Sequence, residues 1–200
     1  HQNTFNISTT VAIVAAAAGI TVAKHGNRAI TSKSGSADVL ETLGIRIDLT
    51  PEETAANLEE NGFAFFFAQK YHPAFKNIGP ARKLCAEQGQ RTIFNFLGPL
   101  LNPARPTAQL IGVPNPALCE PIGKVLQSIG IRRGMVVSGD VGKGYLDELS
   151  TLGTNQIAEF YHDRGFNVEA LDPQSFPIQP AQLEDLRGGT SEENAGLIKA

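Results

Sequence analysis

Short apolar runs separated by polar or glycine-containing segments recur along the chain, and their lengths alternate between those of strands and those of helices. Residues 20–23 and 63–67 are β-branched or aromatic runs, which are typical of buried strands. Residues 11–18 follow a cluster of capping residues and predict a helix. The alternation predicts an α/β fold in which a mainly parallel central sheet is covered by helices.

The other elements follow from the same pattern. Further helices are expected at residues 37–43, 73–88 and 117–129, and two more begin at capping-box pairs, Thr50 with Glu53 and Thr190 with Glu193. Further strands are expected at residues 108–113, 135–138, 157–161 and 167–171. Pro80 predicts a kink or break in its helix, and the Gly-Pro and Asn-Pro pairs predict a loop at residues 97–103. Neither a linker nor a repeat divides the sequence, so one domain over residues 1–200 is expected.

The composition narrows the class of protein. With 200 residues, 42% of them hydrophobic and 18% charged, the chain can bury a sizeable core. A net charge of −3 gives no general attraction to nucleic acid or to an anionic membrane, so a small ligand is favoured over a polymer. Two cysteines form no disulfide framework, which indicates a reducing cytoplasm. The longest apolar run is too short to span a bilayer, and a first residue other than Met suggests a piece of a longer protein.

Candidate chemistry gathers in residues 24–41. The residues that draw attention to this segment, which precedes and enters a predicted helix, are Lys24, Arg28, Gly26, Gly35, Ser34 and Ser36. Positive charge, close backbone approach and a helix N-terminus all favour an anion. The basic residues follow a predicted strand, and the carboxyl ends of strands are where open α/β sheets bind ligands. The segment therefore predicts a phosphate site.

Other motifs leave alternatives open. Asn6-Ile7-Ser8-Thr9 is either a helix cap or part of an anion site. Asp147 and Glu148 are either surface acids or, after a glycine-rich loop, ligands for Mg²⁺. His25 and His72 are better explained as core or loop histidines, since no nucleophile elbow or histidine metal spacing is present. Arg82 is either a surface charge or a clamp for a carboxylate.

Six motifs together resemble a known family. TFNIST, AKHGNRAITSKSGSADVLETLG, FAFFFAQKYHPAFK, RTIFNFLGPLLNPARP, LDELS and LRGGTSEENA occur in this order over nearly the whole chain. They are similar to the anthranilate phosphoribosyltransferases, which share a fold with the pyrimidine nucleoside phosphorylases. The resemblance implies transfer of a phosphoribosyl group from phosphoribosyl diphosphate to the amine of anthranilate, with release of diphosphate, in tryptophan biosynthesis.

The resemblance also implies roles for individual residues. Phosphoribosyl diphosphate would be bound by Thr4, Asn6, Ile7, Ser8, Thr9, Lys24, His25, Gly26, Asn27, Arg28, Ala29, Ile30, Thr31, Ser32 and Ser36. Anthranilate would be bound by Asn27 and Arg82, with His25 and Phe75 beside its ring, and Mg²⁺ by Ser8, Asp147 and Glu148. No acid or base is assigned, because an aniline nitrogen is already neutral near pH 7. A cytoplasmic homodimer is implied, with no nucleic-acid or membrane partner.

Two departures from the family pattern stand out. A glycine-rich GTGGD turn, the N-terminal helical domain and the C-terminal end of the catalytic domain are not in this sequence, which resembles a partial catalytic domain. The segment between Arg82 and Arg91 is a few residues longer than is usual in the family, which weakens the assignment of Arg82. The alternatives are a pyrimidine nucleoside phosphorylase, whose lysine-serine-glycine turn is similar to residues 33–41, and a non-catalytic relative that binds nucleic acid.

Overall fold

The computed structural model describes residues 3–29, 33–90, 92–162, 164–179 and 181–200, and the chain divides into two compact units. We call Asn6–Arg105 with Gly189–Ala200 the helix-rich unit, and His1–Phe5 with Pro106–Gly188 the sheet unit. Each unit is described by itself. The expected single catalytic domain over residues 1–200 stays a prediction. Within the described residues, we find no helix with the length and apolar character that a membrane span requires.

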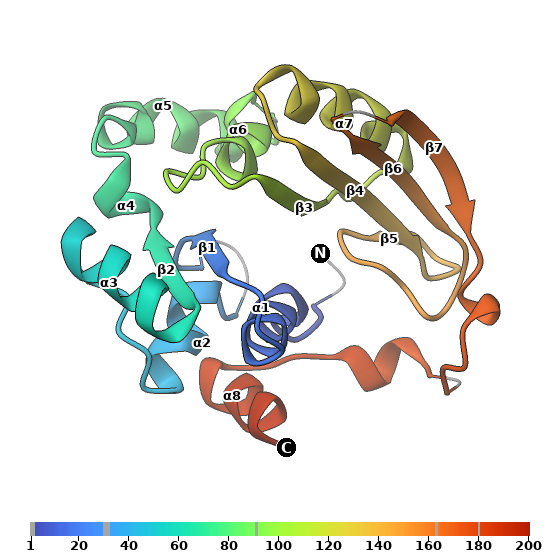
Figure 1. The fold of residues 1–200 in the computed structure, drawn as a ribbon, viewed down its shortest axis with the longest axis horizontal. Coiled ribbons are helices and arrows are strands. Elements are labelled where there is room, and N and C mark those ends of the chain that lie inside the picture. The colour runs from blue at the N-terminus through green and yellow to red at the C-terminus, as the bar shows by residue number, and fades with distance from the viewer. Residues whose placement is uncertain (1–2, 30–32, 91, 163, 180) are drawn as a thin grey trace. The chain divides into compact units, whose positions relative to one another are not determined.

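The helix-rich unit is built around two parallel strands, β1 (Val22–Gly26) and β2 (Phe63–Phe67), which pair from Val22 with Phe63 to Gly26 with Phe67. Its helices are α1 (Ile7–Ala17), α2 (Ser36–Thr42), α3 (Pro51–Asn61), α4 (Ala68–Tyr71), α5 (Phe75–Glu87), α6 (Phe94–Leu100) and α8 (Ser191–Lys199). A cluster of Ala37, Leu40, Ile47 and Phe65 forms a buried core, and α8 packs against α2 although it ends the chain (Figure 1).

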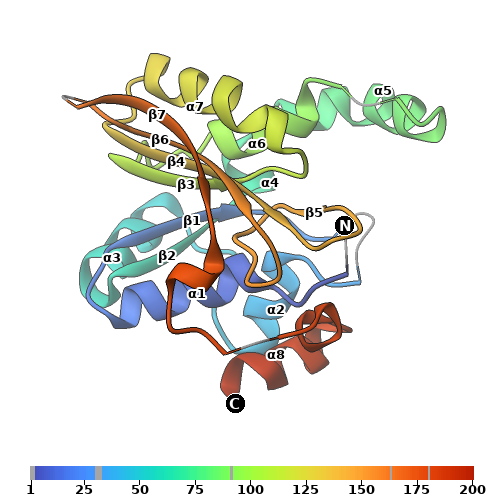
Figure 2. The ribbon, with the colours of Figure 1, turned by 90° about the vertical axis from the view of Figure 1, so that its right-hand side faces the viewer.

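The sheet unit contains a mixed sheet in the order β3 (Ala108–Gly112), β4 (Arg133–Asp140), β6 (Asn155–Tyr161) and β7 (Gly165–Leu171), with β5 (Tyr145–Leu146) beside β4. Helix α7 (Cys119–Ser128) packs on one face, against β4 and β6 (Figure 2). Short 3-10 helices lie at Pro116–Leu118, Pro173–Ser175 and Leu183–Leu186. Thr4 forms an isolated antiparallel bridge with Arg187.

The α/β class is confirmed, but a mainly parallel sheet is wrong for the sheet unit. In the described residues, only β3 pairs with β4 in parallel there, whereas the pairings of β4 with β5, β4 with β6, and β6 with β7 are antiparallel. The connections explain the difference. The segments from β4 to β5 and from β6 to β7 are too short for a crossover helix, and short connections favour antiparallel neighbours.

The local signals for helix ends are confirmed. Thr50 accepts a hydrogen bond from the backbone N–H of Glu53 (3.2 Å) while the Glu53 carboxylate accepts one from the Thr50 N–H (2.8 Å). Thr190 and Glu193 form the same box at α8, with distances of 3.3 and 2.8 Å. Gly62 ends α3 in the left-handed conformation (φ 66°). These contacts lie within a few residues of one another, which is why the sequence alone predicts them.

Two predicted boundaries are wrong. β1 ends at Gly26 rather than at residue 23, because its parallel partner β2 is five residues long and pairs along its whole length. The loop expected at residues 97–103 begins inside α6, which continues through Gly98 and Pro99. Contacts with β1 hold this segment: Asn102 donates a hydrogen bond to the carbonyl of Ala23 (2.9 Å), and such tertiary contacts outweigh weak helix propensity. At Pro80, α5 is not broken.

Candidate active site

The end of β1 sends consecutive side chains to opposite faces. Lys24 Nζ donates a hydrogen bond to Ser8 Oγ at the start of α1 (2.8 Å). The next residue, His25, instead lies with its Nδ1 3.2 Å from the carbonyl oxygen of Gly98 in α6. Because side chains alternate along a strand, this short segment supplies one residue to a polar region near α1 and another to an aromatic region near α6.

The N-terminus of α1 has an open polar end. Asn6 is at the N-cap position, but its side chain makes no hydrogen bond to its own helix, and the first turn contains no acidic residue. The amide of Asn6 instead donates to the carbonyl of Ser34 (3.3 Å) and accepts from Ser34 Oγ (3.4 Å). Of the two interpretations left open by the sequence, capping by this side chain is wrong. An uncapped helix N-terminus whose own first turn has no carboxylate favours an anion.

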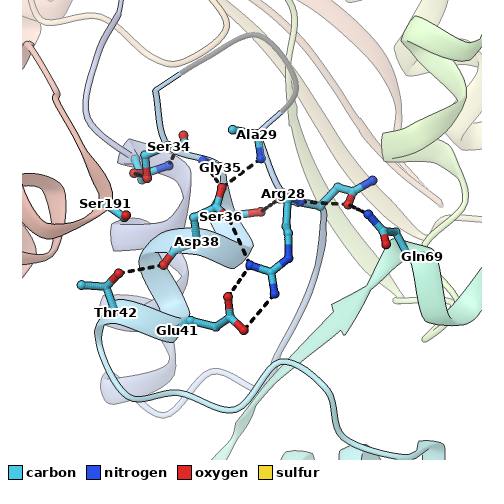
Figure 3. A network of polar contacts seen from close by, with 12 residues as sticks. Arg28, Ala29, Ser34, Gly35, Ser36, Asp38, Glu41, Thr42, Gln69 and Ser191 are labelled. Atoms are coloured by element: carbon cyan, nitrogen blue, oxygen red, sulfur yellow. Dashed lines mark hydrogen bonds and ion pairs between the residues drawn. The ribbon is translucent and has the colours of Figure 1, made fainter. Parts of the chain in front are cut away.

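The turn after β1 is held on α2 by one carboxylate (Figure 3). Asp38 Oδ2 accepts hydrogen bonds from the backbone N–H groups of Ala29 and Gly35, each at 2.9 Å, while Arg28 Nη1 lies 3.2 Å from its other oxygen. Partial burial acts to raise the pKa of Asp38, but these hydrogen bonds and the arginine outweigh it and the pKa is lowered. Asp38 therefore occupies the N-terminal end of α2, which leaves the N-terminus of α1 as the candidate anion-binding end.

Arg28 is engaged by acidic side chains of α2. Its Nη1 atom contacts Asp38, and both Nη atoms contact the Glu41 carboxylate, with Nη2 2.9 Å from Oε1. The hydrogen bond with Glu41 is the main cause that raises the pKa of Arg28 above its usual value. The planar fork of arginine suits this bidentate pairing. Its predicted role as a ligand for phosphoribosyl diphosphate requires that the side chain exchange these partners for the substrate.

Two glycines allow the chain to pack tightly at this turn. A Cβ at Gly35 would lie 2.7 Å from the carbonyl carbon of Arg28 and 2.9 Å from the carbonyl oxygen of Asn27. At Gly26 it would overlap Ser36 Oγ and lie 2.9 Å from the Phe65 ring. The close approach predicted from these glycines therefore occurs between segments of the chain itself. Any larger side chain would displace the turn that carries Asn27 and Arg28.

An aromatic cluster lies near the other face of β1. The ring centroids of His25 and His72 are 5.1 Å apart in an edge arrangement, and His72 stacks on Phe75 at 5.3 Å. The Nε2 atoms of both histidines are buried, and neither has a hydrogen-bond partner in the described part of the chain. Burial, followed by the nearby His72, lowers the pKa of His25 in spite of its contact with Gly98. Buried polar atoms without a partner are uncommon in folded proteins, which makes this aromatic cluster a candidate functional site.

Asn27 and Arg82 are the remaining predicted acceptor ligands. Asn27 Oδ1 accepts hydrogen bonds from its neighbour's N–H (2.8 Å) and from Gln69 Nε2 in α4 (3.3 Å). Arg82 lies on α5, seven residues after Phe75. Residues seven positions apart lie on the same face of a helix, so these two share one face of α5. The unusual length before Arg91 lies C-terminal to Arg82, where α5 continues to Glu87. The extra residues therefore do not change the offset between Phe75 and Arg82.

In the sheet unit, Asp147 and Glu148 lie on a segment whose backbone packs closely against two strands. Asp147 and Glu148 directly follow β5 and are half-buried. A Cβ at Gly112 in β3 would overlap the carbonyl oxygen of Asp147, and one at Gly139 in β4 would lie 2.7 Å from that of Glu148. β3 and β4 thus each have a glycine where the acidic segment crosses them. The missing side chains let the backbone of the acidic segment lie directly on the sheet.

A buried asparagine anchors the same segment. The Asn155 side chain is 1% exposed, and its Oδ1 accepts from the Ser150 N–H (2.6 Å) while its Nδ2 donates to the Ser150 carbonyl (2.9 Å). The amide therefore bonds the backbone of Ser150 as a neighbouring strand would. Packing on the strand glycines and this clamp hold the backbone of the acidic segment.

The structure brings together most of the predicted residues of the helix-rich unit. Asn6, Ile7, Ser8 and Thr9 begin α1, Lys24, His25 and Gly26 end β1, Asn27, Arg28 and Ala29 follow it, and Ser36 begins α2. Thr4, Asp147 and Glu148 belong to the sheet unit. Ile30, Thr31 and Ser32 lie outside the described residues. Sequence reasoning treated His72 as a core or loop histidine and left out Gln69, Asn155 and Asn194. The partners of Gln69 and Asn194 are distant in the chain, and for His72 the nearby Pro73 and Phe75 were the available signal.

The family model described as "Glycosyl transferase family, a/b domain" matches residues 1–200. The chain therefore belongs to this family.

Relatives within the family are consistent with the resemblance seen in the motifs. The chain is 51% identical over 199 residues to a Methanocorpusculum labreanum protein named anthranilate phosphoribosyltransferase, covering 100% of the chain and 56% of that relative. Among solved structures, it matches the Thermus thermophilus anthranilate phosphoribosyltransferase with a TM-score of 0.86 and 45% identity, over 98% of this chain and 56% of that one. The Saccharomyces cerevisiae enzyme in complex with PRPP and Mg matches with a TM-score of 0.84 and 30% identity, over 98% and 52%. The chain thus spans about half the length of these relatives.

Proposed function

We propose that the protein containing this chain transfers the phosphoribosyl group of phosphoribosyl diphosphate to the amine of anthranilate, releasing diphosphate. The observation that carries the proposal is the contact between Lys24 and Ser8 (2.8 Å), which joins the polar end of α1 to the basic end of β1. The names of the relatives, and the ligands named for the yeast enzyme, PRPP with Mg in one structure and 4-fluoroanthranilate in another, support this reaction. These names do not support the phosphorylase or nucleic-acid alternatives.

We assign phosphoribosyl diphosphate to the polar end of the helix-rich unit. Lys24 supplies a cation, Ser8 and Ser36 supply hydroxyl groups, and the backbone of α1 offers N–H donors without a capping side chain. Cleavage at the anomeric carbon leaves positive charge on the sugar and negative charge on diphosphate. Cations and N–H donors around the diphosphate therefore stabilise the transition state more than the ground state. Thr4 and residues 30–32 remain part of the assignment by resemblance.

We assign anthranilate to the aromatic cluster. The ring would lie beside His25 and Phe75, Arg82 would bind the carboxylate, and Asn27 would orient the amine. The lowered pKa of His25 favours a neutral imidazole near pH 7, which suits a contact with an aromatic amine better than an imidazolium does. Placement beside the developing sugar cation supplies much of the rate effect, so the reaction requires no strong base.

The acidic residues fit a magnesium ion. Asp147 and Glu148 provide carboxylate oxygens, the hard donors that Mg²⁺ prefers, and the family resemblance alone adds the hydroxyl oxygen of Ser8 to the ligand set. No group of three or more His, Cys, Asp or Glu in the described ranges is arranged to hold a metal ion; the proposal gives the remaining coordination to diphosphate oxygens. Mg²⁺, when bound, offsets the negative charge that develops on the leaving diphosphate. The packing of the acidic segment on Gly112 and Gly139 would hold both carboxylates in place.

The test is a transferase assay on the protein at the full length of its relatives. Anthranilate fluorescence should fall only when phosphoribosyl diphosphate and Mg²⁺ are both present. Lys24→Ala and Ser36→Ala should mainly raise the KM for phosphoribosyl diphosphate, and Arg82→Ala the KM for anthranilate. No loss of fluorescence under these conditions would contradict the proposal. Phosphorolysis of thymidine or uridine, or tight and salt-sensitive DNA binding without transferase activity, would favour the alternatives instead.

We further propose that the complete protein is a cytoplasmic homodimer. The support is the resemblance together with a composition of two cysteines, neither in a disulfide. Analytical ultracentrifugation of the full-length protein is the measurement, and a monomer at micromolar concentration would contradict the dimer.

A further inference from the structure

Asn194 connects the last helix of the chain to the polar end of α1. Its side chain is 2% exposed, and its Nδ2 donates a hydrogen bond to Asn6 Oδ1 at 2.8 Å across 188 positions of sequence. At its other end, Asn194 Oδ1 accepts from the Gly189 N–H at 2.8 Å. The buried amide therefore has a strong partner for both of its atoms, which fixes which end is the donor.

This contact determines how the amide of Asn6 is oriented. Asn6 Oδ1 accepts from Asn194 Nδ2 and, more weakly, from Ser34 Oγ at 3.4 Å, so the oxygen faces these two donors. Asn6 Nδ2 donates one hydrogen to the Ser34 carbonyl at 3.3 Å. An amide nitrogen carries two hydrogens, and the second has no partner within the residues that the structure describes. The asparagine that could have capped α1 is instead held by α8.

The orientation matters because Asn6 belongs to the proposed anion site. If the amide turned over, its carbonyl oxygen would replace the N–H donor, and an oxygen repels the phosphate that an N–H attracts. A donor directed at Asn6 Oδ1 prevents this reversal. Ser34 alone is a weak restraint, because its hydroxyl can rotate to donate elsewhere.

We infer that Asn194 is a positioning residue of the phosphoribosyl diphosphate site, which acts by holding the Asn6 amide with its second N–H available to the substrate. The inference rests on the proposed function. It gives the final helix a role at a site formed by residues near the start of the chain. Asn194 belongs to the LRGGTSEENA motif, and the motif alone does not reveal this role.

The decisive variant is Asn194→Asp, which keeps the size of the side chain. Its carboxylate can still accept from the Gly189 N–H but cannot donate to Asn6 Oδ1, so the Asn6 amide should turn over. We expect the KM for phosphoribosyl diphosphate to rise at least tenfold while the KM for anthranilate changes less than twofold. A KM for phosphoribosyl diphosphate within twofold of the wild type would overturn the inference.

The matched control is Thr190→Ala. It removes the side-chain half of the α8 capping box while leaving Asn194 in place. We expect a lower melting temperature with an unchanged KM for phosphoribosyl diphosphate. If this variant raised that KM as much as Asn194→Asp does, general weakening of α8 would explain both results and the inference would fail.

A double-mutant cycle with Asn6→Ala separates positioning from a structural role. If Asn194 acts through Asn6, Asn194→Asp should add no further rise in KM once Asn6 is alanine. Multiplying effects would contradict the inference. Should Asn194→Asp not fold, Asn194→Ser provides the same cycle with a neutral side chain too short to reach Asn6, and a rise of at least threefold is expected.

Calorimetric titration with inorganic diphosphate and Mg²⁺ distinguishes failure of this inference from failure of the proposed function. A wild-type protein that binds diphosphate but lacks transferase activity would contradict the proposed function while leaving the role of Asn194 measurable. In that case the Kd for diphosphate should rise at least tenfold in Asn194→Asp, and an unchanged Kd would overturn the inference. A wild-type protein that binds no diphosphate would overturn both.

Discussion

Two segments are positioned by different forces: residues 24–29 and 33–36 of the helix-rich unit, which we call the anion turn after the ligand proposed for it, and residues 147–150 of the sheet unit, which we call the acidic segment. Asp38 and its partners hold the anion turn with charged hydrogen bonds, and the Arg28 side chain is 44% exposed. The acidic segment instead lies on strand glycines and is clamped by Asn155, which is 1% exposed. Salt screens exposed charges far more than buried neutral contacts. Salt should therefore act on the anion turn much more than on the acidic segment.

The contrast also suits the ligands that we propose. A diphosphate is a large anion that can exchange with existing carboxylate partners, and an exposed network permits this exchange. Mg²⁺ requires oxygen ligands at well-defined distances, and a segment packed against a sheet supplies them. The variants below are ordered from the largest expected effect to the smallest, and each alters one side of this comparison.

Gly112→Ala should have the largest effect. The new Cβ would overlap the Asp147 carbonyl, so the acidic segment has to move. We expect the free energy of unfolding to fall by about 3 kcal/mol, and the Mg²⁺ concentration for half-maximal activity to rise at least tenfold. Gly196→Ala in α8, where a Cβ meets no atom within 4 Å, is the control: it should leave the magnesium dependence unchanged and raise the free energy of unfolding by about 0.5–1 kcal/mol. If the magnesium dependence of Gly112→Ala were unchanged, the packing of the acidic segment on Gly112 would not contribute to magnesium binding.

Asn155→Ala should reduce the free energy of unfolding by about 2–3 kcal/mol, because it leaves the N–H and carbonyl of Ser150 without their buried partner. Urea denaturation at low and high salt is the measurement. The same loss at 0.05 and 1 M NaCl is expected for a neutral clamp. A loss that shrinks as salt rises would show that charge contributes to holding the acidic segment.

Asp38→Ala should destabilise the protein by about 2 kcal/mol, because the N–H groups of Ala29 and Gly35 lose their acceptor. Part of this loss should disappear at 1 M NaCl, in contrast to Asn155→Ala. Asp38→Asn is the matched control, since it retains an acceptor oxygen and loses only the charge. If Asp38→Ala and Asp38→Asn were equally unstable, the ion pair rather than the backbone hydrogen bonds would hold the turn.

Acidification should destabilise the protein through His25. Its pKa in the folded protein is below the value of 6.5 for an unperturbed histidine, so the unfolded chain binds the proton more readily. This contribution to stability is complete above about pH 6.5 and is lost as the pH falls below it, with a slope of at most about 1.4 kcal/mol per pH unit. His25→Gln should flatten the pH dependence of unfolding.

Arg28→Gln should have the smallest effect on stability. Exposed ion pairs contribute about 0–1 kcal/mol, so urea denaturation should detect little change. The variant nevertheless tests the role implied by the resemblance. If Arg28 exchanges its carboxylate partners for the substrate, the KM for phosphoribosyl diphosphate should rise several-fold, and an unchanged KM would restrict Arg28 to holding the turn on α2.

The elements that the sequence predicts correctly depend on neighbours within a few positions. The capping pairs of α3 and α8 and the left-handed Gly62 belong to this group, as does the strand at Phe63–Phe67. Predictions fail where distant segments intervene. The length of β1 depends on pairing with β2, and the Gly-Pro segment stays helical while it contacts β1. Local propensities are worth less than such tertiary contacts.

The sequence by itself determined the family, the α/β class and most of the candidate residues, because motifs of consecutive residues carry this information. Only the tertiary structure decided what those residues do to one another. Asp38 and Glu41 engage Arg28, and Asn194 restrains Asn6 from a position 188 residues away. A hydrogen bond depends on a distance of about 3 Å and on direction. Spacing along a chain sets neither for residues brought together by folding.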